Sequence, residues 1–113
     1  MNDTEPLKPA ALHILLALAE HTSHGYAIMQ TVRERSGGRI PLQTGSFYRH
    51  LTWLIEQGLV AEAAVRRPAE DARRGTHYCI TPRGREVLEA ERRYLARVLS
   101  SFDGLRARKG ASS

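Results

Sequence analysis

The stretch that decides the fold is TGSFYRHLTWLIEQGLV, residues 44–60. Its apolar side chains share one sector of a helical wheel: Phe47, Leu51, Leu54 and Ile55. Thr44 or Ser46 can cap the first turn, and Gly58 can end the last. The side away from the apolar residues carries a second group: Ser46, Arg49, His50 and Trp53. A helix that only supports a core does not need that assortment, so this helix is predicted to bind something.

Two further helices are predicted before it. Residues 10–19, AALHILLALA, are apolar on nearly all sides, so the first helix must be covered by several neighbours. The next five residues, HTSHG over 21–25, break that pattern. A second helix then runs over about residues 24–35 and ends at Gly37 or Gly38, where glycine takes the left-handed conformation of a helix end.

A hairpin is predicted after the third helix. Residues 59–66 alternate in a strand pattern and residues 77–81 form a second strand, with a polar connection that contains Pro68 and Gly75. The connection and its flanks carry four arginines: Arg66, Arg67, Arg73 and Arg74. These arginines either bind phosphates of a nucleic acid or belong to a solvated hairpin tip whose charge Glu70 and Asp71 partly neutralise.

A fourth helix of about twenty residues is predicted from Pro82 onward. Its apolar stripe contains Leu88, Tyr94, Leu95, Val98, Phe102 and Leu105. Three short helices cannot cover so much apolar surface, so the stripe predicts a homodimer. The expected organisation is a DNA-binding domain over residues 1–81, a dimerisation helix over 82–108 and a disordered tail over 109–113.

Composition narrows the function. The chain has 113 residues, enough for one domain, and 17 Lys and Arg against 12 Asp and Glu give a net charge of +5. An anionic partner is therefore expected, with nucleic acid as the first candidate.

The same sequence indicates a cytoplasmic protein without a membrane span. A single cysteine, Cys79, excludes an internal disulfide framework, and Asp3 and Glu5 stand where a secretory signal carries positive charge. The apolar run over residues 10–19 is half the roughly 20 residues that cross a bilayer.

Three helices followed by a two-stranded hairpin is the order of a winged helix-turn-helix. The predicted fold class is therefore mainly α with a small β-hairpin. In that fold the third helix enters the major groove of double-stranded DNA while the hairpin touches the backbone. Arginine suits the O6 and N7 atoms of guanine, so Arg49 is the first candidate for reading a base.

Three segments also carry a family resemblance. HGYAI (24–28), GSFYRHLTWLIEQGLV (45–60) and THYCITPRGREVL (76–88) resemble, in order and spacing, the His-Gly-Tyr, Gly-Thr-Leu-Tyr-Pro and Tyr-x-x-Thr-x-x-Gly segments of PadR-type transcriptional regulators. The resemblance implies a cytoplasmic homodimeric repressor with a C-terminal dimerisation helix, which binds an inverted-repeat operator and is often released by a small molecule.

Two departures from the family bear on DNA recognition. Ser46 and Phe47 replace threonine and leucine and are conservative in role. Arg49 stands where members usually have proline and adds a charge to this helix, so the operator need not match that of other members. The resemblance implies a phosphate contact for Tyr48. The predicted DNA-contacting residues are Thr44, Ser46, Tyr48, Arg49, His50, Arg66, Arg67, Arg73 and Arg74.

Trp53 has two interpretations. Its wheel position is neither in the core nor in the first turn, and packing under the fourth helix of a partner copy is favoured, because large aromatic side chains most often serve burial. The resemblance nominates it instead, with Tyr94 and Phe102, for a pocket that takes a small aromatic or cationic effector.

Other functions have weaker support in the sequence. Two pairs, His21 with His24 and His77 with Cys79, lack the third and fourth ligands of a metal site, so no metal and no cofactor are predicted. No catalytic constellation accompanies Cys79, so no enzyme is predicted. The alternatives that stay open are a metal-sensing or redox-sensing regulator and a winged-helix adaptor that binds a protein partner.

Overall fold

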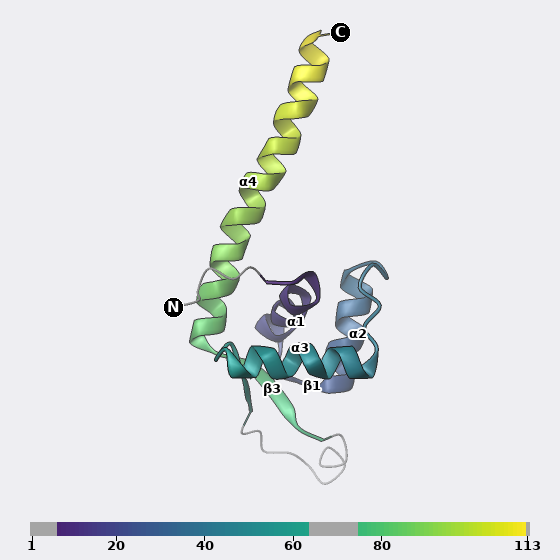
Figure 1. Ribbon diagram of the computed structural model, residues 1–113, viewed down its shortest axis with the longest axis vertical. Coiled ribbons are helices and arrows are strands. Elements are labelled where there is room, and N and C mark those ends of the chain that lie inside the picture. The colour runs from purple at the N-terminus through teal and green to yellow at the C-terminus, as the bar shows by residue number, and fades with distance from the viewer. Residues whose placement is uncertain (1–6, 64–74, 113) are drawn as a thin grey trace.

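The computed structural model describes residues 7–63 and 75–112 and confirms a mainly helical winged helix-turn-helix. Helices α1 (Pro9–Glu20), α2 (Gly25–Arg35) and α3 (Thr44–Glu56) pack into one body, and α4 (Pro82–Ser112) projects from it (Figure 1). The projection makes the molecule elongated, with extents of 64 × 33 × 23 Å.

The core lies where α1 meets α2, α3 and the sheet. Helix α1 contributes five buried residues, and from α3 three of the four predicted inward residues are buried: Phe47, Leu51 and Leu54. The fourth, Ile55, is exposed. Ile28 and Val32 of α2 complete the helical part of this core. Burial of these side chains, at about 1.5–3 kcal/mol each, is the main force that fixes α3 against the body.

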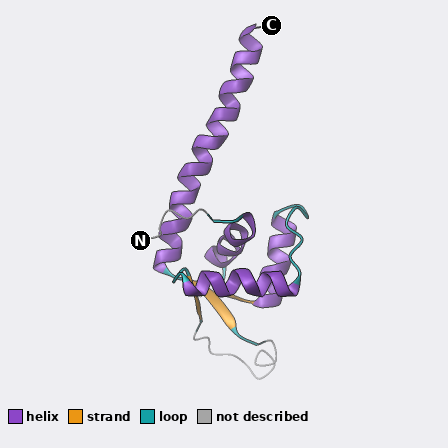
Figure 2. Cartoon of the chain, viewed as in Figure 1, coloured by secondary structure: helices purple, strands orange, loops and turns teal. Residues whose placement is uncertain are grey.

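The sheet has three strands, one more than the sequence predicts. Its strands β1 (Ser23–His24), β2 (Val60–Glu62) and β3 (His77–Ile80) are antiparallel and lie in the order β1-β3-β2 (Figure 2). Strand β1 falls in the segment that the sequence marks only as a helix break, because two residues are too few to show a strand period. Strand β2 covers Val60–Glu62 of the predicted strand 59–66, whose residues 64–66 lie outside the described residues.

The glycine ends of the helices are confirmed, but the predicted cap of α3 is wrong. Gly37, Gly38 and Gly58 have φ of 64°, 80° and 77°. The N-cap of α3 is Gln43. Instead of capping, the Ser46 hydroxyl donates back to the Gln43 carbonyl at 3.1 Å.

One threonine fastens α4 to the end of α3. Thr81 Oγ1 accepts a hydrogen bond from the Gly84 amide (2.9 Å), which caps α4, and donates to the Gly58 carbonyl (2.6 Å). The Thr81 amide donates to the Leu59 carbonyl at 3.0 Å. The start of α4 is thereby tied to the turn that closes α3.

Gly84 allows this close approach. A Cβ at Gly84 would lie 2.3 Å from the Leu59 carbonyl oxygen and 2.7 Å from Ile80 Cγ1, so any side chain would force the helix away. Arg83 adds a hydrogen bond from Nε to the Gln57 carbonyl at 3.3 Å.

Helix α4 is longer than predicted. Its 31 residues correspond to about 46 Å, and its backbone stays helical through residues 109–112, which the sequence predicts as a disordered tail. Val87 and Leu88 pack against the core. Beyond them the apolar side chains are exposed in the single chain: Tyr94, Leu95, Leu99, Phe102 and Leu105.

Replacing Gly84 with alanine is expected to destabilise the fold by at least about 1–3 kcal/mol, because the added methyl group collides with backbone. Gly104→Ala on the same helix is the matched control. A Cβ there meets nothing within 4 Å, so it should stabilise α4 by about 0.5–1 kcal/mol. Urea unfolding of both variants measures the difference, and equal effects would refute the steric role of Gly84.

Candidate nucleic-acid interface

The outward sector of α3 is defined by which of its residues are buried. Phe47, Leu51 and Leu54 face the core. The sector away from them is exposed and contains Gly45, Tyr48, Arg49, Thr52 and Glu56, and Thr44 is exposed in the first turn. These residues are presented to solvent along the length of a rigidly packed helix, which is the geometry needed to enter a groove of nucleic acid.

The structure divides the polar group that the sequence places opposite the apolar face. Arg49 is exposed near the middle of the outward sector, whereas Ser46, His50 and Trp53 are half-buried along one flank. Trp53 packs against the core of its own chain, although its wheel position predicts a place outside the core. The favoured packing of Trp53 under the fourth helix of a partner stays a prediction. Thr52 was missed by sequence reasoning, although a wheel centred on the buried residues places it between Tyr48 and Arg49.

Tyr48 joins three parts of the molecule. Its hydroxyl lies so close to Gly25 that a Cβ there would be 2.6 Å from the oxygen. Its ring stands edge-on to Phe47, with centroids 4.8 Å apart. Tyr78 of β3 is also near, since burial together with Tyr48 and Glu62 raises the pKa of Tyr78. The start of α2, the outward sector of α3 and the sheet therefore meet at Tyr48.

His50 lies in a setting that opposes its protonation. Partial burial lowers the pKa of its imidazole, and the positive charges of Arg49 and Lys8 lower it further. The folded state therefore favours a neutral ring.

The histidines near the sheet do not assemble a metal site. His24 Nδ1 accepts a hydrogen bond from the Ala27 amide at 3.4 Å and so begins α2, as its position suggests. The His24 and His77 rings are edge-on with centroids 5.5 Å apart, and Cys79 is half-buried farther along β3. Within residues 7–63 and 75–112, no three His, Cys, Asp or Glu side chains come together to hold a metal ion.

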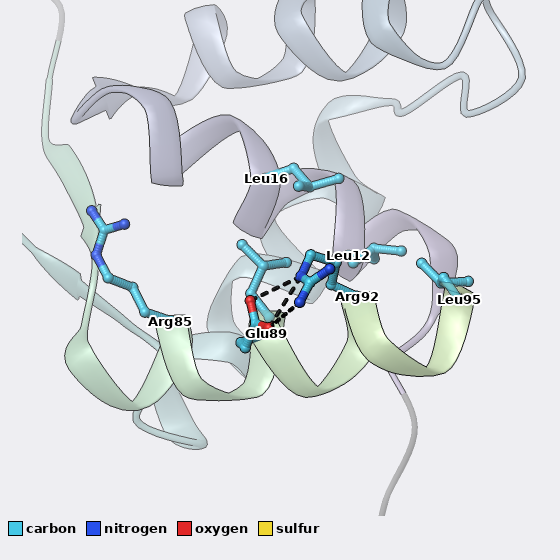
Figure 3. Close-up of a pocket in the computed structure, with 7 residues that line it drawn as sticks. Leu12, Leu16, Arg85, Glu89, Arg92 and Leu95 are labelled. Carbon is cyan, nitrogen blue, oxygen red and sulfur yellow. Dashed lines mark hydrogen bonds and ion pairs between the residues drawn. The ribbon is translucent and has the colours of Figure 1, made fainter. Parts of the chain in front are cut away.

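A cavity of about 400 Å³ lies between α1 and α4 (Figure 3). Its lining residues are Leu12, Leu16, Arg85, Leu88, Glu89, Arg92 and Leu95. The leucines are apolar walls and the three charged residues come from α4. The residues predicted for an effector pocket, Trp53, Tyr94 and Phe102, are not part of this lining.

The four wing arginines, Arg66, Arg67, Arg73 and Arg74, lie outside the described residues. Within the part of the chain that the structure describes, no helix is both long and apolar enough to cross a membrane.

Comparisons with known proteins give the same fold. A family model described as the transcriptional regulator PadR-like family matches residues 14–90. A PadR family transcription regulator from Clostridium difficile R20291 superposes with a TM-score of 0.66 at 23% identity, covering 84% of this chain and 98% of that one. A transcriptional regulator from Clostridium thermocellum gives 0.67 at 20% identity, covering 83% and 89%.

A curated relative is longer. The uncharacterized 37.1 kDa protein in transposon TN4556 of Streptomyces fradiae is 40% identical over 89 residues, which are 79% of this chain. The chain spans about a quarter (24%) of the length of that relative.

The pKa of His50 is expected to lie below the ordinary value of about 6.5. Below about pH 6.5 the unfolded chain binds a proton at His50 more readily than the folded chain does. The contribution of His50 to the free energy of unfolding is therefore fully present above about pH 6.5 and is lost as the pH falls below that value. Arg49→Ala should raise the pKa of His50 only part of the way toward its ordinary value, since burial lowers this pKa more than the charge of Arg49 does. An NMR titration measures it, with Arg97→Ala on α4 as a control that should change nothing.

Proposed function

Because the chain belongs to the PadR-like family of transcriptional regulators, we propose that it is a sequence-specific DNA-binding regulator that acts in the cytoplasm as a homodimeric repressor. Family membership makes it a domain of a regulator and not of an enzyme. The observation that carries the proposal is the exposed outward sector of α3, with Arg49 near its middle and Tyr48 and Thr52 beside it.

In this proposal α3 enters the major groove of double-stranded DNA. The Arg49 guanidinium donates to guanine O6 and N7, which is the commonest specific contact between protein and DNA. Thr44, Ser46 and Thr52 line the same helix and offer hydroxyls to base edges or phosphates. His50 is neutral and half-buried, so its contribution is a hydrogen bond rather than a charge.

Contacts to the phosphate backbone fix the register of α3 in the groove. Tyr48 is 43% exposed while its hydroxyl rests at the start of α2, so its ring is held in one place at the edge of the groove. Arg66, Arg67, Arg73 and Arg74 supply positive charge from the wing, and each phosphate they neutralise makes binding more sensitive to salt.

A homodimer is the second part of the proposal. The exposed apolar side chains of α4 need a cover, and a second copy supplies one with the same chemistry. Two α3 helices about 34 Å apart, one turn of DNA, would then read an inverted repeat.

A small aromatic or cationic effector that releases the DNA is the third part. Trp53 packs on the core, while Tyr94 and Phe102 stand exposed on α4 about two turns apart. A ligand that contacts both Trp53 in the helical body and the aromatic residues of α4 would therefore change the packing of α4 against the second copy. Fluorescence anisotropy of the DNA complex, titrated with aromatic cations, tests for this release.

Arg49→Ala is expected to cost about 1–3 kcal/mol on the operator and to reduce the preference for operator over scrambled DNA. Arg73→Ala should weaken binding to all sequences about equally and lower the salt slope by about one. Arg97→Ala removes the same charge from the part of α4 that projects away from α3, and should leave both affinities nearly unchanged. Fluorescence anisotropy over a salt series, with DNA from upstream of the gene, measures all three.

Two outcomes would contradict the proposal. Unchanged preference in Arg49→Ala would refute base reading by that residue. Weak wild-type binding, equal for promoter and scrambled DNA across many promoters, would favour an adaptor that uses the winged fold to bind a protein.

A further inference from the structure

Three nitrogen-bearing side chains come together where the start of α1 lies beside α3. Arg49 and His50 follow one another on α3, and Lys8 is the N-cap residue of α1. Helices α1 and α3 are in contact (Figure 1), and the charges of Lys8 and Arg49 both act on the His50 imidazole. These three residues therefore form one basic surface that is built from two helices.

No acidic side chain of the described residues neutralises this surface. Arg35, by contrast, is held by Glu20 in an ion pair. Within residues 7–63 and 75–112, neither Lys8 nor Arg49 takes part in an ion pair or a side-chain hydrogen bond. Both cations are therefore available to an anion from outside the chain.

The His50 ring is half-buried, yet its nitrogens still reach solvent. No side chain or backbone group of the described residues forms a hydrogen bond with the ring. In the same part of the chain, no fully buried side-chain nitrogen or oxygen atom lacks a hydrogen-bond partner. Both ring nitrogens must therefore contact water, and a ligand atom can take the place of that water.

The backbone of Lys8 is fixed although its side chain is exposed. Leu7 packs against the core on one side, and Pro9 begins α1 on the other. The Lys8 carbonyl accepts a hydrogen bond from the Leu12 amide at 2.9 Å, and the Lys8 side chain makes no cap hydrogen bond. Because only the side chain has to be ordered, Lys8 can bind an anion at a small entropy cost.

The place of this surface on α3 indicates which anion it meets. Arg49 lies near the middle of the outward sector, whereas His50 lies on its flank, on the side of Lys8. A helix with its side chains is about 10–12 Å across and the major groove is about 12 Å wide. When the middle of α3 faces base edges, its flanks therefore face the phosphates that line the groove.

We propose that Lys8 and His50 bind one phosphate group of the DNA backbone, beside the base that Arg49 reads, and that the complex takes up a proton at His50 as the pH falls. This inference rests on the proposed function. It adds a phosphate site formed by α1 and α3, and it makes the affinity for DNA depend on pH.

The direction of the pH dependence follows from the charges around His50. In the free protein, burial and the positive charges of Arg49 on α3 and Lys8 on α1 hold the pKa of His50 below its ordinary value. The ring is then neutral at neutral pH and offers the phosphate a hydrogen bond. The phosphate brings a negative charge that favours the protonated ring, so the pKa of His50 is higher in the complex. By linkage, DNA binds more tightly as the pH falls through that higher pKa.

Operator binding at about pH 7.5 and about pH 5.8 tests the proton uptake. Fluorescence anisotropy at constant salt, with a dye whose emission does not change with pH, gives the dissociation constants. The wild-type constant should fall about three- to tenfold on acidification, which corresponds to a rise of about half to one unit in the pKa of His50. His50→Gln should lose most of this change. His21→Gln, which removes an exposed histidine at the other end of α1, is the matched control and should keep it.

An NMR titration of the wild-type protein reads the same proton directly and needs no variant. The pKa of His50 should be higher with operator DNA bound than in the free protein. The pKa of His21 should change little on binding, because His21 lies at the far end of α1 from Lys8.

Lys8→Ala tests the phosphate contact without touching the core. The affinity for operator and for scrambled DNA should fall about two- to fivefold alike, and the salt slope should decrease by about one. Arg97→Ala, which removes an exposed charge from the projecting part of α4, is the matched control and should leave the salt slope unchanged.

The outcomes separate this inference from the regulator itself. A pH dependence that is the same in the wild type and in His50→Gln, or a pKa of His50 that DNA does not raise, would overturn the proton uptake. An unchanged salt slope in Lys8→Ala would overturn the phosphate site. Both results leave a sequence-specific regulator in place, whereas wild-type protein that shows no preference for the operator at either pH refutes the proposed function as well.

Discussion

The hydrogen bonds of Thr81 are the constraint on which the rest of the structure depends. One hydroxyl caps α4 through Gly84 and binds the carbonyl of Gly58, the residue that ends α3. Because Gly84 has no side chain, the first turn of α4 comes into contact with the Leu59 backbone. The helix proposed to read DNA and the helix proposed to bind a partner are thus held together directly by hydrogen bonds.

A second junction, at Tyr48, explains why three separate segments of the sequence carry the family resemblance. Gly25 gives room for the Tyr48 hydroxyl, and Tyr78 approaches from the sheet. Each segment supplies one side of the same contact, so a change in one would disturb the other two. The tyrosine stays half-exposed at this junction. A side chain that is both exposed and held from three sides is preorganised for binding, because little rotamer entropy remains to be lost.

The helical body was predictable because its signals are local. Apolar spacing identified the inward side of α3, and positive φ at Gly58 followed from the need to end a helix. Strand β1 and the α1–α4 cavity were not predictable, since both arise from contacts between residues far apart in the chain. The helical wheel of α3 correctly predicted that Arg49 is exposed. It also placed His50 and Trp53 on the exposed side, although both are half-buried, because the predicted buried side was centred too far from these two residues. Burial by neighbouring elements, which no wheel contains, decides that boundary.

The continuous helix α4 connects the surface proposed to bind a partner to the surface proposed to bind DNA. If two copies pair through the exposed apolar side chains of α4, the angle between the two α4 helices sets the separation of the two α3 helices. In such a dimer a helix of about 46 Å would act as a lever, so that a small change in the contact between the two α4 helices becomes a larger displacement at Arg49. In the proposed regulator, a ligand would not need to approach α3 to release DNA. It needs only to bind one arrangement of the α4 pair more tightly than the other, and its differential affinity limits the shift it can cause.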